Sequence, residues 1–309
     1  MNKKVLCAAG ALALAALSLP AQAQVAEECR TVRFSDVGWT DITATTAAAK
    51  HVLEGLGYDV DVKVLSVPVT FASLESDDVD VFLGNWMPAQ QDNYDKFVAS
   101  GAVDQLAQNL DGTEYTLAVP SYVYEAGVKT FADLDQHAEK FGRKLYGIAS
   151  GSPANESIRQ MIESDEFGLG DWKLVESSEQ AMLVQVGRAV KRNEFVVFLG
   201  WTPHPMNVNY DMQYLRGGEK YFGESGSVNT LARKDYASQC PNVGKLLSNL
   251  SFTQDMENSI MDQVLSKQAS NAEAIKAWLK ANPEALDGWL QGVTTRDGGD
   301  ALAAVKAQL

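Results

Sequence analysis

The sequence predicts an α/β fold built from two domains. Segments typical of strands alternate with segments typical of helices along most of the chain, which is the pattern of parallel sheets with helical crossovers. The chain has 309 residues, more than one average domain requires. An apolar strand motif, Val-Phe-Leu-Gly followed by tryptophan and proline, occurs at 81–88 and again at 197–203. The two copies indicate two similar sheet edges.

The first 23 residues are typical of a secretory signal peptide. Lys3 and Lys4 precede an apolar run that is too short to span a bilayer comfortably, and Ala21-Gln22-Ala23 is a small-residue cleavage site. We expect cleavage after Ala23 and an exported, soluble mature chain, with an uncleaved membrane anchor as the alternative. Cys7 lies inside the apolar run and not at the cleavage point, so a lipoprotein anchor is not expected.

The first α/β series runs from residue 31 to residue 102. Its predicted strands begin near 31 and cover 59–67 and 79–86, and its predicted helices are 42–58, 70–80 and 88–102. Pro88 is expected in the first turn of the last helix, where a proline costs no hydrogen bond. The order predicts a parallel sheet with right-handed crossovers.

A second series follows a β-rich stretch at 114–124, where Pro120 is a plausible point for the chain to enter another domain. Its predicted elements are a helix at 130–141, a strand at 145–150, a helix from 155 or 156 to 166, a strand at 172–178, a helix at 179–193 and a strand at 194–201. The polar, glycine-rich segment 214–239 is consistent with a return crossing, and four helices are predicted at 241–250, 253–265, 271–282 and 283–293. The expected division is 24–115 plus 214–309 for domain I and 116–213 for domain II.

Cysteine and charge composition limit the functional classes. Cleavage would leave Cys29 and Cys240, an even pair that reads as a disulfide in an oxidising compartment, with two buried free thiols as the alternative. Two cysteines and three scattered histidines are too few for a predicted metal site. Without Lys3 and Lys4 the 26 basic residues become 24 against 40 acidic ones, a formal charge of −16, which argues against nucleic acid or anionic lipid as a partner.

Three tryptophans occupy the predicted carboxyl ends of strands, where ligands of open α/β sheets bind: Trp39, Trp86 and Trp201. Packing at the rim of the core is the alternative for each one. Trp172, Trp278 and Trp289 are interpreted as core residues. Several aromatic faces in one pocket suit a quaternary ammonium group, which has no N–H to donate but is attracted to indole and phenol rings. A sugar site would also use aromatic faces, but with more polar side chains.

Motifs along essentially the whole mature chain resemble the periplasmic choline-binding proteins of choline/betaine ABC importers. They include RFSDVGWTDITATTA, LSVPVTFASL, DVFLGNWMPA, YTLAVPSYVY, YGIASGSPANESI, VESSEQAML, VFLGWTPHPMN, CPNVGKLLSNLSFT, AWLKANP and WLQGVTTRDG. The resemblance implies a type II periplasmic binding protein fold, with two α/β domains and a ligand cleft between them. It also implies no enzymatic activity, no cofactor, a monomer in the periplasm, and an importer permease and ATPase as partners.

The resemblance also assigns residues to the site. It implies an aromatic box around the trimethylammonium group made by Trp39, Trp86, Tyr115 and Trp201, an acidic residue near the ligand at Asp41, and an asparagine that meets the ligand hydroxyl at Asn155. Cys29 and Cys240 fall where the family has cysteines. Helix capping alone is the alternative for Asn155, and strand packing is the alternative for Tyr115.

One loop departs from the family pattern. Members tend to have a glycine-rich loop with an arginine after the asparagine, whereas residues 151–156 read Gly-Ser-Pro-Ala-Asn-Glu. Glycine betaine and carnitine share the headgroup of choline but end in a carboxylate, which Asp41 would repel unless backbone N–H groups or a cation offset it. Choline is therefore the expected ligand, with carnitine or glycine betaine as the alternatives.

Two further functions use similar features. An exported choline-ester hydrolase would need a nucleophile with a base, but no Gly-x-Ser-x-Gly motif occurs and His51, His137 and His204 lie in unsuitable contexts. A sensory module that presents its ligand to a membrane receptor would use the same cleft as a transport protein.

Overall fold

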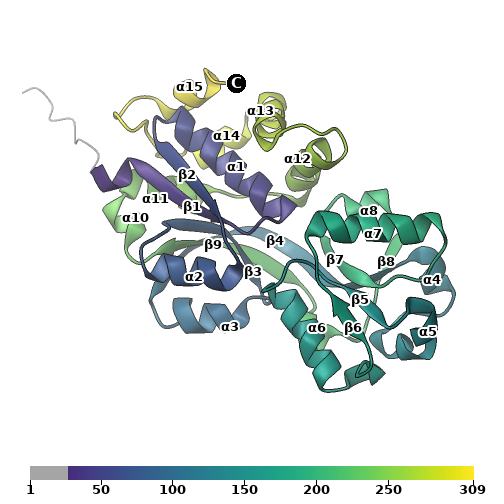
Figure 1. Ribbon diagram of the computed structural model, residues 1–309. Helices are drawn as coiled ribbons and strands as arrows, with labels where there is room; N and C mark the ends of the chain where they lie inside the picture. The colour runs from purple at the N-terminus through teal and green to yellow at the C-terminus, as the bar shows by residue number, and fades with distance from the viewer. Residues whose placement is uncertain (1–26) are drawn as a thin grey trace, which may run out of the picture.

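The fold consists of two lobes that share a strand, seen in a computed structural model that describes residues 27–309 (Figure 1). Lobe I is built on a sheet formed by strands at 31–36, 59–64, 81–87 and 226–233 together with residues 103–113 of the strand at 103–120. Lobe II is built on residues 114–120 of the same strand together with strands at 144–146, 173–175, 198–202 and 212–214. The predicted signal peptide, its cleavage after Ala23 and Cys7 lie outside the described residues. Within residues 27–309, no helix is both long and apolar enough to cross a membrane.

Lobe I contains a mixed sheet. The strands β1 (Thr31–Asp36), β2 (Asp59–Val64) and β3 (Val81–Met87) are parallel, and helices α1 (Thr40–Gly55) and α2 (Val67–Glu75) connect them as predicted. Strand β9 (Gly226–Arg233) is antiparallel to both β3 and β4. The expectation of a parallel sheet therefore fails at β9, because this strand is reached by the returning chain and not by a helical crossover.

Strand β4 (Val103–Pro120) is the physical link between the lobes. Residues from Val103 to Thr113 pair with β9, and residues from Glu114 onward pair with β7 and β8. The chain therefore changes sheets at the start of the β-rich stretch 114–124, and Pro120 is the last residue of the strand. The predicted domain limits at residues 115 and 214 stay a prediction.

Lobe II packs helices on β5 (Lys144–Tyr146), β6 (Lys173–Val175), β7 (Phe198–Thr202) and β8 (Met212–Tyr214). Its two long helices, α6 (Pro153–Glu163) and α7 (Glu179–Lys191), begin after Ser152 and Ser178, whose hydroxyls accept hydrogen bonds from backbone N–H groups three residues later. The expectation that Asn155 caps α6 is wrong, because Ser152 is the N-cap and Asn155 lies inside the first turn.

Two predicted helices are shorter or more irregular than expected. After Pro88 the chain turns, and regular structure begins only at α3 (Gln91–Asn93), followed by a π-helical turn, η2 (Tyr94–Val98). The segment 130–141 forms η3 (Phe131–Asp133), η4 (Asp135–His137) and α5 (Ala138–Phe141). Thr130 and Asp133 form a capping box around η3, and such local side-chain bonds compete with a continuous helix.

The remaining helices are distributed over both lobes. The four predicted near the C-terminus are present as α11 (Pro241–Asn249), α12 (Gln254–Leu265), α13 (Asn271–Ala281) and α14 (Ala285–Trp289). Others were not predicted: η1 (Glu27–Cys29), α4 (Ser121–Glu125), η5 (Glu166–Gly168), α8 (Met206–Asn209), α9 (Glu219–Phe222), α10 (Tyr236–Gln239) and α15 (Ala301–Lys306). In Figure 1, α1, α12, α13, α14 and α15 gather on one side of the lobe I sheet.

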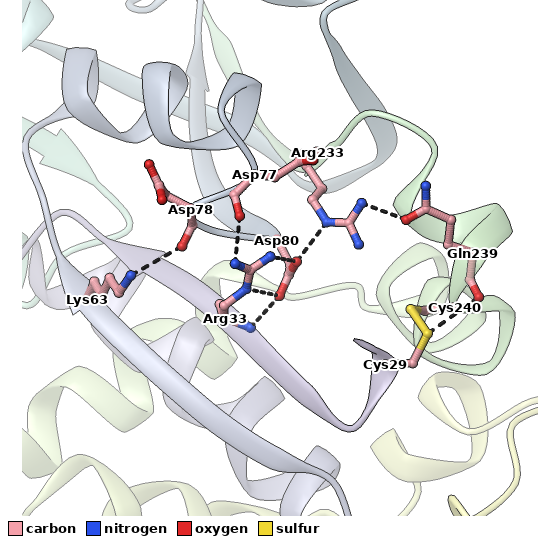
Figure 2. Close-up of polar contacts among 9 residues, drawn as sticks. All are labelled: Cys29, Arg33, Lys63, Asp77, Asp78, Asp80, Arg233, Gln239 and Cys240. Atoms are coloured by element: carbon pink, nitrogen blue, oxygen red, sulfur yellow. Dashed lines mark hydrogen bonds and ion pairs between the residues drawn. A yellow bond between two sulfur atoms is a disulfide. The ribbon is translucent and has the colours of Figure 1, made fainter. Parts of the chain in front are cut away.

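A disulfide and a buried ion-pair network connect distant segments of lobe I (Figure 2). Cys29 and Cys240 form the predicted disulfide, with Cα atoms 5.5 Å apart. Asp80, only 1% exposed, accepts hydrogen bonds from Arg33 Nη2 at 2.6 Å and Arg233 Nε at 2.8 Å. Burial alone would raise the pKa of Asp80, but the hydrogen bonds from Arg33 and Arg233 lower it below its ordinary value. These contacts join β1, β3 and β9 to the segment that carries Cys240.

Replacing both cysteines tests how far the disulfide stabilises lobe I. The variant Cys29→Ser/Cys240→Ser should lose about 2 to 5 kcal/mol of unfolding free energy, because a long closed loop is released in the unfolded chain. Chemical denaturation measures the loss. Dithiothreitol should lower the stability of the wild type but not of the double variant, and equal stability of the two proteins without reductant would contradict the expectation.

Candidate functional site

A cavity of about 40 Å³ lies between the two lobes. A single water molecule needs roughly 10 to 15 Å³ on the same measure, so the space accepts a small group of atoms. The lining residues are Trp39, Asp41, Trp86, Ala89, Tyr115, Ile148, Ser152, Pro153, Ala154, Leu199 and Trp201. The cavity thus collects the four predicted aromatic residues and Asp41.

Lobe I contributes two tryptophans and the carboxylate. Trp39 is the residue before α1, Asp41 lies in the first turn of α1, and Trp86 lies near the end of β3. The indole Nε1–H of Trp86 donates a hydrogen bond to Asp41 Oδ2 at 3.0 Å. This bond fixes the orientation of the indole ring and occupies one of the two carboxylate oxygens.

Lobe II contributes the opposite wall. Tyr115 and Trp201 are direct partners in the antiparallel pairing of β4 with β7. The Tyr115 ring meets the Trp86 ring edge to face, with centroids 6.4 Å apart and planes at 83°, and the Phe222 ring packs against Tyr115 from behind. Rings from the two lobes therefore meet at the cavity.

The glycines of the doubled motif allow this approach. A Cβ atom on Gly84 would lie 2.8 Å from the Phe82 ring, and one on Gly200 would lie 2.9 Å from the Tyr214 ring. Each glycine therefore lets a neighbouring side chain pack directly on the backbone of the strand that carries the tryptophan. In both copies a cis peptide bond precedes the proline that ends the motif, at Pro88 and at Pro203.

Asp41 is a buried acid without a cationic partner among the lining residues. It is 1% exposed, and its Oδ1 has no hydrogen-bond partner in the described chain. Burial, followed by the nearby charge of Glu179, raises the pKa of Asp41 to about 7. Behind it, burial and the charge of Asp41 raise the pKa of Glu257 well above its usual range. The described lining residues include no lysine or arginine.

Asn155 lies outside the cavity lining. Its side-chain amide is fully buried, accepts from the backbone N–H of Ile148 at 3.1 Å, and donates to Ile148 O at 2.8 Å and Glu176 Oε1 at 2.9 Å. These bonds hold Ile148, which does line the cavity. The arrangement makes Asn155 a support for the loop between β5 and α6, and its predicted contact with a ligand hydroxyl stays a prediction.

Sequence reasoning missed the small and apolar lining residues. Leu199 lies two positions before Trp201 on β7, so strand alternation places both side chains on the same face and was a usable signal. The start of α6 lines the cavity with Ser152, Pro153 and Ala154, inside the loop already noted as a departure from the family pattern. Ala89 and Ile148 have no sequence signal that separates them from other apolar residues.

The described residues include no group of three or more His, Cys, Asp or Glu placed to hold a metal ion. Of the three histidines, His204 is closest to the site, with its ring centroid 4.9 Å from that of Trp201. Its Nε2 contacts Glu179 Oε1 at 3.1 Å, and the Ser152 hydroxyl at the cavity accepts from the backbone N–H of Asn155. Ser152 and His204 therefore bond to different partners and do not form a nucleophile–base pair with each other.

Comparison with known proteins places this geometry in a family. Residues 30–281 match the substrate-binding domain of ABC-type glycine betaine transport systems. An ABC-transporter choline-binding protein solved in complex with choline is 51% identical, with a TM-score of 0.90 over 92% of this chain and 99% of the other. A structure described as that type of protein in an unliganded semi-closed conformation is also 51% identical, with a TM-score of 0.84 over 91% and 99%.

A curated relative supports the same assignment at lower identity. The glycine betaine/carnitine transport binding protein of Listeria monocytogenes is 27% identical over 189 residues, which are 60% of this chain and 63% of the relative. The predicted type II periplasmic binding protein fold is confirmed by the solved structures. The TM-score is higher to the choline complex than to the unliganded semi-closed structure.

The buried charge of Asp41 should reduce stability at high pH. Because its folded pKa of about 7 exceeds the ordinary 3.8, stability is lost as the pH rises through about 7. The variant Asp41→Asn avoids this loss, so its advantage over the wild type should grow by about 2 to 3 kcal/mol between pH 5 and pH 8. Denaturation of the ligand-free proteins measures it, with exposed Asp61→Asn as the control. An advantage independent of pH would contradict the assignment.

Proposed function

Because the chain belongs to the family of substrate-binding domains of ABC-type glycine betaine transport systems, we propose that it captures choline between its lobes and delivers it to an importer. The observation that carries this proposal is the cavity itself, where four aromatic residues from two lobes surround the space beside one desolvated carboxylate. The partners are the permease and the ATPase of the importer. The 51% identity to a choline-binding protein supports choline as the ligand.

The chemistry of the cavity suits a trimethylammonium group. Such a cation has no N–H group, so hydrogen-bond acceptors alone cannot hold it. Each desolvated aromatic face contributes roughly 0.5 to 2 kcal/mol to the binding of a cation. Trp39, Trp86, Tyr115 and Trp201 together supply enough favourable contact for useful affinity, and the apolar Leu199 and Ile148 exclude water from the same space.

Asp41 favours a ligand with net positive charge. An ionised Asp41 beside the trimethylammonium group gains a charge partner in a medium from which water is excluded. Its unpartnered Oδ1 is a free acceptor for the hydroxyl of choline. The same oxygen would be repelled by a ligand carboxylate while Asp41 is ionised.

Glycine betaine, with carnitine beside it, is the second candidate. One observation favours such a zwitterion: the first turn of α6 lines the cavity, and a helix N-terminus favours negative charge. The relative from Listeria monocytogenes carries both ligands in its name. A zwitterion in this site would require its carboxylate to lie toward α6 and Asp41 to be protonated.

Periplasmic location and monomeric state belong to the same proposal. The family match to a transport binding domain and the signal peptide predicted at residues 1–23 support export to the periplasm. The disulfide between Cys29 and Cys240 is compatible with an oxidising compartment.

A titration panel tests the ligand, and Trp201 tests the aromatic box. Isothermal titration should show choline binding more tightly than carnitine or glycine betaine.

The variant Trp201→Ala should weaken choline binding at least about thirtyfold, because about 2 kcal/mol of desolvated cation–π contact is lost. Trp278→Ala, a partly buried tryptophan on α13, is the matched control. Absence of binding to all three compounds by the wild type would refute the function, and near wild-type affinity of Trp201→Ala would refute the box.

The pH dependence distinguishes the two ligand classes. Choline requires ionised Asp41, so its affinity should rise between pH 6 and pH 8, by at most about tenfold per unit. Glycine betaine accepts a hydrogen bond from protonated Asp41, so its affinity should fall over the same range. Both slopes depend on the pKa of Asp41 near 7, a group faced by Glu179 of α7 and Glu257 of α12. Titration calorimetry at several pH values measures the slopes, and Asp41→Asn should flatten both.

A further inference from the structure

We propose that Glu179 is a positioning and specificity-determining residue of this site. It joins the two lobes through Thr40 and adds a second buried negative charge near Asp41, so that closure of the cleft favours ligands with net positive charge. This inference rests on the proposed function, because it concerns which trimethylammonium compounds the closed cleft retains. Glu179 itself does not line the cavity.

Glu179 bridges the starts of two helices that belong to different lobes. It is the first residue of α7 in lobe II, and Thr40 is the first residue of α1 in lobe I. The backbone N–H of Thr40 donates to Glu179 Oε2 at 2.9 Å, and the Thr40 hydroxyl donates to Oε1. Thr40 lies between Trp39 and Asp41, so the bridge ends at the segment that forms the lobe I wall.

The second partner of Glu179 connects it to the lobe II wall. The Nδ1 atom of His204 accepts from the backbone N–H of Met206 at 2.9 Å, which leaves the proton of the neutral ring on Nε2. Nε2 then donates to Glu179 Oε1 at 3.1 Å, and the His204 ring packs edge to face on Trp201. Glu179 therefore holds one wall of the cavity through Thr40 and supports the other through His204.

Three hydrogen-bond donors surround the side chain of Glu179. Glu179 is 2% exposed, and the backbone N–H of Thr40, the Thr40 hydroxyl and His204 Nε2 each donate to one of its oxygens. When the lobes close, this charge enters the low-dielectric surroundings of Asp41, and its repulsion is one of the causes that raise the pKa of Asp41. Closure without a ligand thus brings two negative groups together.

The charge of the ligand decides whether this repulsion is relieved. A choline cation in the cavity attracts both Asp41 and Glu179, whereas glycine betaine carries a third carboxylate into the same region. The two carboxylates therefore act unequally on the two ligands, although both ligands present the same headgroup to the aromatic rings. Glu179 contributes through charge at a distance and through the bridge, and not through direct contact.

The variant Glu179→Gln tests the charge. It keeps the size and an acceptor oxygen but removes the charge, so choline affinity should fall by about tenfold while glycine betaine changes by less than about threefold. The pH profile for choline should also move to lower pH, because one source of repulsion on Asp41 is gone. Glu163→Gln, an exposed glutamate on α6 of the same lobe, is the matched control and should change neither quantity.

A second pair of variants separates the charge from the bridge. Thr40→Val removes the hydroxyl donor but no charge, and Glu179→Asp keeps the charge on a shorter side chain. Each should weaken choline and glycine betaine by similar factors and preserve their ratio. These variants also test the proposal if Glu179→Gln does not fold, since a changed ratio in Glu179→Asp would overturn it.

Several outcomes would overturn the inference. Unchanged choline affinity in Glu179→Gln, or an equal loss for both ligands with an unmoved pH profile, would mean that Glu179 serves the structure of lobe II only. Failure of the wild type to bind any trimethylammonium compound would instead refute the proposed function. The two failures are distinguished by the wild-type titration, which is independent of Glu179.

Discussion

A carboxylate that water cannot reach and no cation neutralises is costly to keep in a folded protein, and Asp41 is such a group. The neighbouring residues limit the cost without removing it. Trp86 donates one hydrogen bond, α1 provides its N-terminal turn, and Oδ1 is left without a partner. The negative charge of Asp41 is therefore only partly compensated. It lies at the wall of a cavity whose other lining residues, apart from Ser152, are aromatic or apolar. A monovalent organic cation is the ligand that corrects both the charge and the empty apolar space.

The sequence contains enough information to find the aromatic part of this site. Trp86 and Trp201 follow the same strand motif, and the carboxyl ends of such strands are where α/β proteins bind ligands. The structure brings them together with Trp39 and Tyr115 in one cavity, as predicted. Their direct contact with a ligand stays a prediction. The two-lobe fold was also predictable, because the strands and helices of each α/β series follow one another directly in the sequence.

Features that depend on contacts between distant segments were not predictable. The acids around Asp41 include Glu179 and Glu257, which come from helices far along the chain and look like ordinary surface residues in the sequence. Local sequence does not reveal that the amide of Asn155 bonds to Ile148 and Glu176, and its predicted contact with a ligand hydroxyl stays a prediction. One uninterrupted strand can pair with different partners along its length, so the sequence does not show that β4 pairs with β9 up to Thr113 and with β7 from Glu114.

The continuity of β4 also bears on how quickly the cleft can open. Pairing with β9 is irregular between Asp111 and Thr113, and Gly112 between them has a φ of 69°, a left-handed conformation suited to glycine. Gly112 lies three residues before Tyr115. The chain returns from β8 to β9 through α9, whose Phe222 packs on the same tyrosine. Separation of the lobes therefore requires β4 to bend at its bulge. A strand resists bending more than a flexible linker would. Residues that never touch the ligand can in this way set its residence time, through the rate at which the strand bends and the cleft releases its contents.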